Sequence, residues 1–488
     1  MAVSVLAPGS EEVVGRPTFH LAPTVVDAPS LLDEDGSASS AQISPHTQLL
    51  DARELALDTA QLTAQLIEQQ ARGAPTAIAQ SGVPAAVMTV YTPAQIRSAY
   101  ELPTLPAASS PLTAAQQASL GSGQTIYLID AFDNPNASSD LATFSRVFGL
   151  PACTTTLVSE DTKLPLGAPE PAACTFSVVY VNENGLPGSR APAYDASWAT
   201  EIAIDVQWAH ATAPLARIVL LEAQGASVAQ LAQAIELATR MGPGIVSMSF
   251  GAAEGAWASR HEGIFASSVN SFVASTGDSG SGVCWPSTSA NVLAVGGTTL
   301  SFSGAGTRKE VAWSRTGGGL SSFQAQPEYQ RFVAVPGLPS APRYPRVAAG
   351  PEDDWGRGHA RLMRAVADVS FNADPFSGQF LAMTTPGEPA PKWYSAGGTS
   401  LGVPQWAGLL AISNAQRAQA GLAPLGLAQV RLYENIAPVK GWYAGAFLDI
   451  TAGADGSCAS CRAGPGYDLP TGLGTPNASD LLGLLTVD

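Results

Sequence analysis

The sequence predicts an α/β protein with a mainly parallel central sheet and helices on both of its faces. Between residues 125 and 300, short apolar runs alternate with patterns that are typical of helices. Strands that are apolar throughout are buried on both faces, and parallel strands need a crossover segment between them. The expected strands are TIYLIDAF, RIVLLEA, GIVSMSFG, SFVAS and ANVLAVGGT.

Helices are expected in the segments that connect these strands. One covers residues 198–211, and another ends at Gly242, because glycine favours helix ends. Functional side chains of such sheets collect at the carboxyl ends of strands, where Asp130, Gly251 and Asp278 fall. The remaining expected helices are DLATFSRVFGL and HEGIFASSVN.

Residues 1–87 differ in composition from the rest of the chain. They are rich in Ala, Pro, Ser and Gln, with one expected helix at Ala52–Arg72. We expect a leader or a short, poorly structured prosegment or linker here, followed by one domain over residues 88–488. The first residues carry no basic side chain and reach Glu11 and Glu12 early, so no signal peptide is readable.

The composition indicates a protein with a large core and excludes several classes of partner. The chain has 488 residues, of which 45% are hydrophobic and 13% charged, enough for a large core. Its net charge of −16 argues against nucleic acid or an anionic membrane surface as a partner. No apolar run approaches the ~18–20 residues of a membrane-spanning helix.

The five cysteines leave the redox compartment open. Cys153 and Cys174 flank a loop rich in Pro and Thr and could form a disulfide. Cys458 and Cys461 form a CxxC pair without two further zinc ligands nearby, which favours a local disulfide or free thiols. Cys284 is expected to be a buried single thiol.

Ser400 is a candidate nucleophile in the segment YSAGGTSLGVPQWAGLLA. It follows Gly397 and Gly398, and Pro404 is expected in the first turn of the next helix. A helix N-terminus favours developing negative charge on an oxyanion. A serine in this position is more often a helix cap, so a catalytic role requires a partner base.

Two carboxylates provide that base more readily than a histidine does. The sequence has no HGT segment, which a subtilisin-type triad would need, and no GxSxG motif. A histidine in the setting of His210 is more often a surface or packing residue than a base. Glu201 and Asp205 lie four residues apart, on one face of a helix. Acidic pairs usually face solvent, but these flanks are almost wholly apolar, which predicts burial. Buried neighbouring carboxylates share protons, and one pKa rises.

Asp278 is a third candidate acid, in STGDSGSG after a strand. An aspartate in a Gly/Ser turn is most often a turn former. Its place at the carboxyl end of a strand favours a functional role. Asp130, Asp133, Asp368 and Asp374 are assigned to structure rather than to catalysis.

Five motifs occur in an order that matches a known family. They are TEIAIDVQWAHATAPLARIVLLEA, IVSMSFG, STGDSGSG, GGTSLGVPQWAGLL and LDI…AGPGYDLPTGLGTPN. Together they resemble the sedolisins, the serine-carboxyl peptidases, over roughly residues 88–488. The resemblance implies a subtilisin-like fold and a peptidase that hydrolyses protein or peptide substrates at acidic pH.

The resemblance also implies roles for individual residues. Ser400 matches the nucleophile, Glu201 the general base, Asp205 the acid that hydrogen-bonds to Glu201, and Asp278 the acid that donates to the oxyanion. The segment of Ser249, Phe250 and Gly251 would pair with the substrate backbone by strand addition, although it could also be a buried core strand.

The resemblance further implies one bound Ca²⁺ ion near the C-terminus. Carboxylates and carbonyl oxygens from a Gly-rich loop are ligands that a hard cation prefers. On composition alone, the AGPGYD segment could equally be a turn. The implied ligands are Asp449 and Asp468 through carboxylates, and Ile450, Gly464 and Gly466 through backbone carbonyls.

The family usually carries a long folded N-terminal prosegment, for which residues 1–87 are short. Secretion or a periplasmic location is expected from the family, and a monomer is expected. Two alternative functions stay open: a catalytically silent homologue that binds peptides, and a histidine-dependent serine hydrolase. The latter requires His210 or His261 within hydrogen-bond reach of Ser400.

Overall fold

The computed structural model describes residues 13–26, 89–106, 111–303, 306–337 and 362–487. The expected helix at Ala52–Arg72, together with His46 and His359, lies outside these residues. Within them, no helix is long and apolar enough to cross a membrane.

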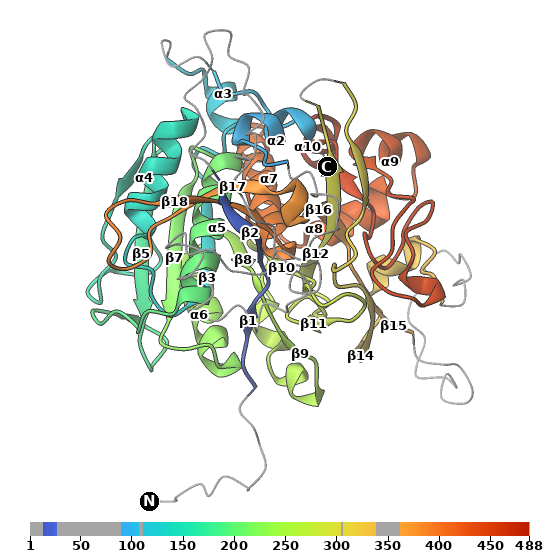
Figure 1. Ribbon diagram of the computed structural model, residues 1–488, viewed down its shortest axis with the longest axis horizontal. Coiled ribbons are helices and arrows are strands. Elements are labelled where there is room, and N and C mark those ends of the chain that lie inside the picture. Colours follow the sequence, from blue (N-terminus) through green and yellow to red (C-terminus); the bar gives the residue numbers. More distant parts are fainter. Residues whose placement is uncertain (1–12, 27–88, 107–110, 304–305, 338–361, 488) are drawn as a thin grey trace, which may run out of the picture.

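A ten-stranded sheet forms the centre of the molecule (Figure 1). Its strand order is β13-β12-β10-β8-β3-β7-β5-β4, with β16 beside β12 and β6 beside β5. The pairs from β12 to β4 are parallel, and β13 is an antiparallel edge strand. The predicted mainly parallel sheet is therefore confirmed. The strands are β3 (Thr125–Ala131), β4 (Cys153–Thr155), β5 (Cys174–Val181), β6 (Pro187–Gly188), β7 (Arg217–Ala223), β8 (Gly244–Met248), β10 (Asn270–Ser275), β12 (Val292–Ser301), β13 (Lys309–Ala312) and β16 (Val369–Asn372).

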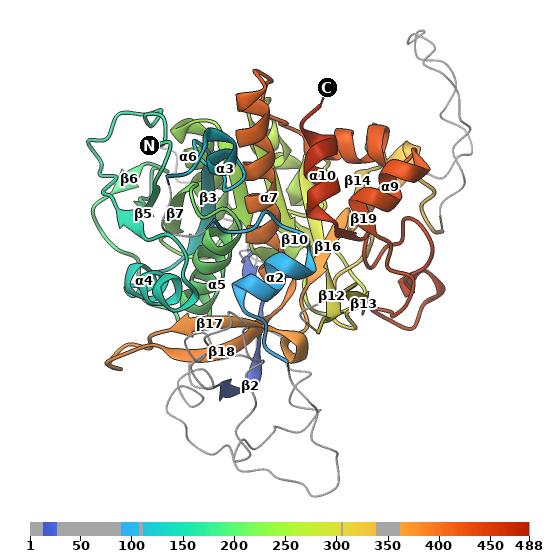
Figure 2. The ribbon, with the colours of Figure 1, turned by 90° about the horizontal axis from the view of Figure 1, so that it is seen from above.

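Alternating side chains of the central strands pack against helices on opposite faces. Ile126 and Leu128 of β3 belong to the core that includes α5 (Ala196–Thr212) and α7 (Thr399–Gln419). Tyr127 and Ile129 belong to the second core, with α6 (Val228–Met241). Figure 2 shows α7 passing through the middle of the molecule. Almost every residue of α5 and most of α7 are buried, as expected for helices that are apolar on all sides.

Smaller elements surround this framework. Helix α4 (Ala137–Phe148) packs beside α5, and three-stranded sheets are formed by β1-β9-β11 and by β17-β18-β2. The strands of these sheets are β1 (Arg16–Pro17), β2 (His20–Val26), β9 (Phe250–Ala253), β11 (Cys284–Trp285), β17 (Gln379–Met383) and β18 (Lys392–Gly397). The two-stranded sheets are β14 (Gly319–Ala325) with β15 (Met363–Val366) and β19 (Phe447–Leu448) with β20 (Thr475–Pro476). The remaining helices are α2 (Pro93–Ala99), α3 (Ala114–Ala118), α8 (Ala428–Val430), α9 (Lys440–Ala446) and α10 (Ala478–Leu485), with the 3₁₀ turns η4 (Glu328–Phe332), η5 (Pro375–Ser377) and η7 (Ala459–Cys461) and the π-helix η6 (Arg431–Ile436).

Two local expectations were wrong. HEGIFASSVN does not form an α-helix: the region holds the short 3₁₀ helices η2 (Ala256–Arg260) and η3 (Glu262–Phe265). The hydroxyl of Ser267 accepts hydrogen bonds from the amides of Val269 and Asn270, which turns the chain into β10 instead.

Pro404 lies inside α7, in its second turn rather than its first, because α7 already begins at Thr399. A proline at this place cannot donate to the carbonyl of Ser400. The hydroxyl of Ser249 lies 3.5 Å from that carbonyl oxygen.

Two disulfides are present, Cys153–Cys174 and Cys458–Cys461, and Cys284 is a free thiol. The first disulfide joins the paired strands β4 and β5 at directly opposite residues. The second lies within the C-terminal loop that the sequence suggested for calcium.

Candidate active site

Ser400 and Glu201 meet where α7 packs against α5. The hydroxyl of Ser400 donates a hydrogen bond to Glu201 Oε2 at 2.8 Å, and both residues are fully buried. The helices approach closely at Gly408, where an added Cβ would lie 2.7 Å from the side chain of Thr212. The sequence predicted Glu201 on a buried helix and Ser400 at the start of another helix. In the structure these two positions bring the hydroxyl of Ser400 into hydrogen-bond contact with the carboxylate of Glu201.

Glu201 belongs to a group of buried carboxyls whose pKa values are raised. Burial first, and then the charges of Asp205 and Asp130, raise the pKa of Glu201 well above its ordinary value. Burial raises the pKa of Asp205 to about 8, against a lowering effect from the hydroxyl of Ser249, which donates to Asp205 Oδ1 at 2.6 Å. Among the described residues, Glu201 Oε1 and Asp205 Oδ2 have no hydrogen-bond partner. Either oxygen can therefore carry a proton without losing a hydrogen bond.

Asp130 is a member of this group that the sequence analysis assigned to structure. It is the second-last residue of the central strand β3 and is fully buried, and neither carboxyl oxygen has a hydrogen-bond partner in the described part of the chain. Burial, followed by the charges of Asp205 and Glu222, raises its pKa well above the ordinary value. Its position at a strand's carboxyl end was a usable signal, but the sequence could not show which helix faces it.

Asp278 lies at the other side of Ser400. Its Oδ1 accepts hydrogen bonds from the amide and the hydroxyl of Thr399, at 2.8 and 2.7 Å. Gly398 has a positive φ of 99°, and a Cβ there would lie 2.6 Å from Asp278 Oδ2. A glycine is needed at this position both for its backbone conformation and for the close approach of the acid.

The segment of Ser249, Phe250 and Gly251 borders the same site. The carbonyl oxygen of Ser249 lies 3.2 Å from the hydroxyl of Ser400. Phe250 and Gly251 begin β9, which pairs antiparallel with β1 of the N-terminal segment. Ser249 thus contacts Asp205 through its side chain and Ser400 through its backbone.

The N-terminal segment supplies two contacts that the sequence analysis missed. The amide of Thr18 donates to Glu201 Oε2 at 3.0 Å. His20 Nε2 lies 3.3 Å from Asp278 Oδ2, and burial followed by the charge of Arg315 lowers the pKa of His20 to about 3. These contacts join residues far apart in the chain, and the Ala- and Pro-rich composition around them gave no signal of either.

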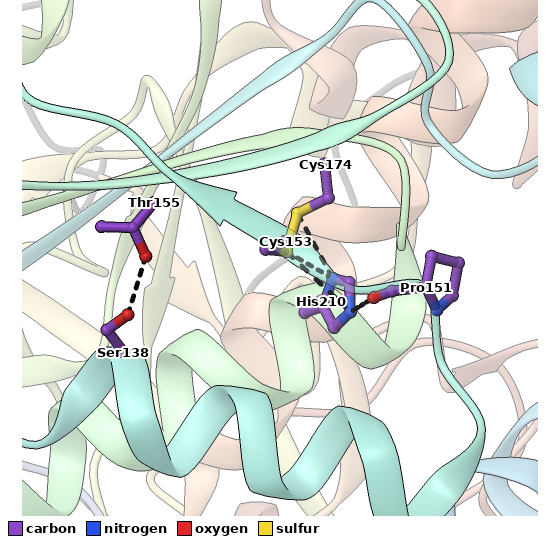
Figure 3. Close-up of a disulfide and its surroundings, with 6 residues drawn as sticks. All are labelled: Ser138, Pro151, Cys153, Thr155, Cys174 and His210. Carbon is purple, nitrogen blue, oxygen red and sulfur yellow. Dashed lines mark hydrogen bonds between the residues drawn. A yellow bond between two sulfur atoms is a disulfide. The ribbon is translucent and has the colours of Figure 1, made fainter.

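The other two described histidines, His210 and His261, contact groups other than Ser400. His210 Nε2 donates to the carbonyl of Pro151 at 2.8 Å, and its Nδ1 lies 3.3 Å from Cys153 Sγ of the disulfide (Figure 3). Burial lowers the pKa of His210 to about 4. The ring of His261 packs against Trp257 and Trp285. Among the described residues, the side chain to which the hydroxyl of Ser400 donates at 2.8 Å is the carboxylate of Glu201, and no histidine has a hydrogen bond to Ser400.

The residues suggested for calcium lie in one loop. The amide of Gly466 donates to Asp449 Oδ2 and that of Gly464 to Asp468 Oδ2, each at 2.9 Å. Burial raises the pKa of Asp468 to about 6, and the charge of Asp449 adds to this effect. Among the described residues, no backbone amide donates to the carbonyl oxygens of Ile450, Gly464 or Gly466. Two interacting carboxylates and three free carbonyls fit an oxygen-ligated cation.

Comparison with known proteins assigns the family. The subtilase family profile matches residues 173–420. The chain belongs to the subtilase family. Kumamolisin of Bacillus sp. (strain MN-32) is 30% identical over 446 residues, covering 85% of this chain and 66% of kumamolisin. Tripeptidyl-peptidase 1 of Canis lupus familiaris is 34% identical over 226 residues, which are 42% of this chain and 36% of that protein.

These relatives place the chain in the sedolisin branch of the subtilases, as its motifs suggested. The chain spans less than two thirds of the length of either relative. The solved structure of Pseudomonas sedolisin, a serine-carboxyl proteinase complexed with two molecules of pseudo-iodotyrostatin, has the same fold. It aligns with a TM-score of 0.57 at 22% identity and covers 81% of this chain and 98% of that one.

The buried carboxyls predict a stability that falls as pH rises. Asp205 has an ordinary pKa of 3.8 and a folded-state pKa of about 8, so the folded state binds a proton that the unfolded state releases. Its stabilising contribution is complete below the unfolded pKa and is lost as pH rises through the folded pKa. We expect the melting temperature to fall between about pH 4 and pH 8, and to fall less in Asp205→Asn. Calorimetry at constant ionic strength measures this, and equal slopes for both proteins would contradict it.

Proposed function

We propose that this chain is a serine-carboxyl endopeptidase that hydrolyses peptide bonds at acidic pH. The observation that carries the proposal is the 2.8 Å hydrogen bond from Ser400 to Glu201, inside a group of carboxyls whose pKa values are raised. A serine needs an adjacent base to act as a nucleophile, and a carboxylate base remains usable in acid, where a histidine is protonated.

In the proposed reaction, Ser400 attacks the substrate carbonyl while Glu201 takes its proton. Asp205 keeps a proton near Glu201 and limits the charge that builds up between the two groups. Glu201 then returns its proton to the leaving amine, and water hydrolyses the acyl-enzyme. Glu201 and Asp205 thus act as one proton-sharing unit.

The oxyanion that forms would be bound by the amide of Ser400 and by a protonated Asp278. Because Asp278 Oδ1 already accepts two hydrogen bonds from Thr399, the proton belongs on Oδ2. Donors placed in advance in this way typically lower a barrier by ~2.7–4 kcal/mol each. Ser249, Phe250 and Gly251 would hold the substrate backbone by strand addition.

The second candidate is a homologue that binds peptides without cleaving them. The complete set of Ser400, Glu201, Asp205 and Asp278 at one buried place disfavours it, since a binding module needs no such proton-sharing group. A peptide-library assay in acid, with cleavage products identified by mass spectrometry, distinguishes the two functions.

The nucleophile and base are tested by Ser400→Ala and Glu201→Gln. Each should reduce peptide hydrolysis by roughly 10⁴-fold to 10⁶-fold, because residues that act as one catalytic unit fail together. The matched control is Ser413→Ala, which removes another buried hydroxyl from α7 and should leave hydrolysis unchanged. Full activity of Glu201→Gln would exclude Glu201 as the base.

The pH profile should be a bell centred in the acid range. Burial and neighbouring charges raise the pKa of Glu201 above 4.5, so activity should rise only above that pH, as Glu201 becomes able to accept a proton. Activity should fall again as Asp278 ionises and places a negative charge beside the oxyanion. In Asp278→Asn, which cannot ionise, the activity that remains should persist to higher pH. A wild-type optimum above neutrality, measured on folded protein, would overturn these roles.

The C-terminal loop is proposed to hold one Ca²⁺ ion with a structural role. The carboxylates of Asp449 and Asp468 and the carbonyls of Ile450, Gly464 and Gly466 would be its ligands. A hard cation there would offset the repulsion between the two carboxylates and so stabilise the loop.

Calcium removal should therefore lower the melting temperature. A ligand that binds only the native state stabilises it by ~2.7 kcal/mol at a concentration one hundred times its dissociation constant. Asp468→Ala should abolish the response to chelator and to added Ca²⁺ in thermal melts, whereas Asp480→Ala, at an exposed position of α10, should retain it. An identical melting curve of the wild type with and without chelator would contradict the site.

The proposed substrates are proteins and peptides, and the enzyme is proposed to act as a monomer outside the cytoplasm, in a secreted or periplasmic setting. The two disulfides support that location, because disulfides persist in oxidising compartments.

A further inference from the structure

His210 of α5 lies against the Cys153–Cys174 disulfide that joins β4 to β5. Its Nδ1 is 3.3 Å from Cys153 Sγ and 3.6 Å from Cys174 Sγ, so the ring faces both sulfur atoms (Figure 3). One ligand atom from each of the three residues lies within 4.8 Å of the other two. His210 and Cys174 are buried, whereas Cys153 is partly exposed. One imidazole and two sulfur atoms thus form a compact cluster that solvent reaches at Cys153.

The Nδ1 atom of His210 has a lone pair, and no described residue offers it a hydrogen-bond donor. Nε2 lies 2.8 Å from the carbonyl oxygen of Pro151, which can only accept, so Nε2 carries the hydrogen. Burial is the main cause that lowers the pKa of His210 to about 4, so near neutral pH Nδ1 carries no hydrogen. The sulfur atoms of a disulfide have no hydrogen to donate. A fully buried nitrogen lone pair is therefore aimed at two sulfur atoms without a donor, which calls for an explanation.

The surroundings of His210 are those of a metal ligand. A histidine that binds a metal ion through one ring nitrogen almost always donates its other N–H to a carbonyl, a carboxylate or water, which fixes the ring. The carbonyl of Pro151 makes that contact here. Tetrahedral zinc has bonds of ~2.3 Å to sulfur and ~2.0 Å to nitrogen, which places these ligands ~3.5 Å apart. The separations of 3.3 and 3.6 Å between Nδ1 and the two sulfur atoms agree with this value.

The disulfide has to be reduced before a cation can bind at this cluster. Thiolates, and not disulfide sulfur atoms, are the cysteine ligands of zinc, and two of them lie ~3.8 Å apart in a tetrahedral site. Cys153 and Cys174 are directly opposite residues of the paired strands β4 and β5, and β5 also pairs with β7. The backbone pairing therefore keeps both thiols beside His210 after their bond is broken.

The charges of such a site are compatible with its burial. A divalent cation, two thiolates and a neutral imidazole have no net charge, and a neutral complex avoids most of the cost of burying an ion. The guanidinium of Arg97 donates to the carbonyl oxygens of Ala211 and Thr212 at 2.8 and 3.0 Å, and its fixed positive charge acts on His210. A positive charge nearby stabilises thiolates.

We propose that Cys153, Cys174 and His210 form a redox-controlled site for a thiophilic divalent cation such as Zn²⁺. A dithiol first reduces the disulfide: two electrons and two protons pass to the two sulfur atoms, and the dithiol becomes a disulfide. The cation then binds both sulfur atoms and Nδ1 of His210, and the two thiol protons are released to solvent. Bound cation and disulfide exclude each other, because they use the same sulfur atoms. None of the three residues takes part in the proposed peptidase reaction.

The test titrates Co²⁺, and then Zn²⁺, into the full-length protein at neutral pH without oxygen. The protein carries Cys458→Ser and Cys461→Ser, so that this pair contributes no thiols. It is reduced with a phosphine that is then removed, because a dithiol would itself bind the metal ion. One Co²⁺ per chain should bind with the absorption of a tetrahedral thiolate complex, and Zn²⁺ should displace it. The same protein before reduction should show no such absorption.

Two further proteins separate this site from other metal-binding groups and from the fold. Adding Cys153→Ser and Cys174→Ser to the same chain should abolish the thiolate absorption, whereas Co²⁺ bound by carboxylates elsewhere never produces it. His210→Gln keeps an amide that can donate to the carbonyl of Pro151 but removes the imidazole nitrogen. It should weaken binding by ~100-fold or more, since even the hydrogen-bond partners of a ligand typically contribute ~10–100-fold. In the parent protein, Zn²⁺ should also slow the re-formation of the Cys153–Cys174 disulfide by an added oxidant.

Three results would overturn the proposal. One is a reduced protein whose thiolate absorption with Co²⁺ does not exceed that of the variant without Cys153 and Cys174. In that case the reduced thiols only hydrogen-bond to His210. Another is a His210→Gln variant that binds with the affinity and the spectrum of the parent. The third is a reduced chain that stays unfolded by circular dichroism with the metal ion present.

Discussion

The packing of α5 against α7 is the constraint on which the site depends. Both helices are buried along nearly their whole length, so the polar side chains that they carry can be satisfied only by other buried protein groups. Ser400 and Glu201 meet in this way at 2.8 Å. The same burial that holds the helices together raises the pKa values of Glu201 and Asp205. Fold stability and the raised pKa values of the carboxyls therefore have one physical origin, the exclusion of water from the interface between two helices.

The backbone around Asp278 is tied to the C-terminal loop. The amide of Ser281 donates to the carbonyl of Asp455 at 2.8 Å, and the amide of Asp455 donates to Cys461 of the second disulfide at 3.0 Å. A ligand or disulfide that stiffens the C-terminal loop thus also limits the movement of the turn that carries Asp278. This gives the proposed calcium site a consequence for the oxyanion side of the active site, although the two are far apart in the sequence.

The sequence was sufficient for the parts of the structure that periodicity determines. The central strands and the buried helix with Glu201 and Asp205 follow from apolar runs and from i, i+4 spacing, and the family motifs supplied what the resemblance implied for Ser400 and Asp278. The contribution of Asp130 was not predictable, because it depends on which helix covers the end of β3. The failed helix at HEGIFASSVN has a local cause, the hydroxyl of Ser267 competing for backbone amides. The pairing of residues 13–26 could not be predicted from the sequence, because strands this short are stabilised by partners hundreds of residues away.

Those distant partners also explain why so short a segment is ordered. An isolated extended peptide gains little from its own contacts, but here both of its halves complete existing sheets, and the core takes the ring of Phe19. The backbone pairing does not depend on side chains, so it can hold many sequences, whereas the buried positions of Thr18, Phe19 and His20 select among them. Under the proposed peptidase function, an extended substrate that replaced this segment would meet the same two surroundings: sheet edges on both sides of Ser400 and buried positions beside it.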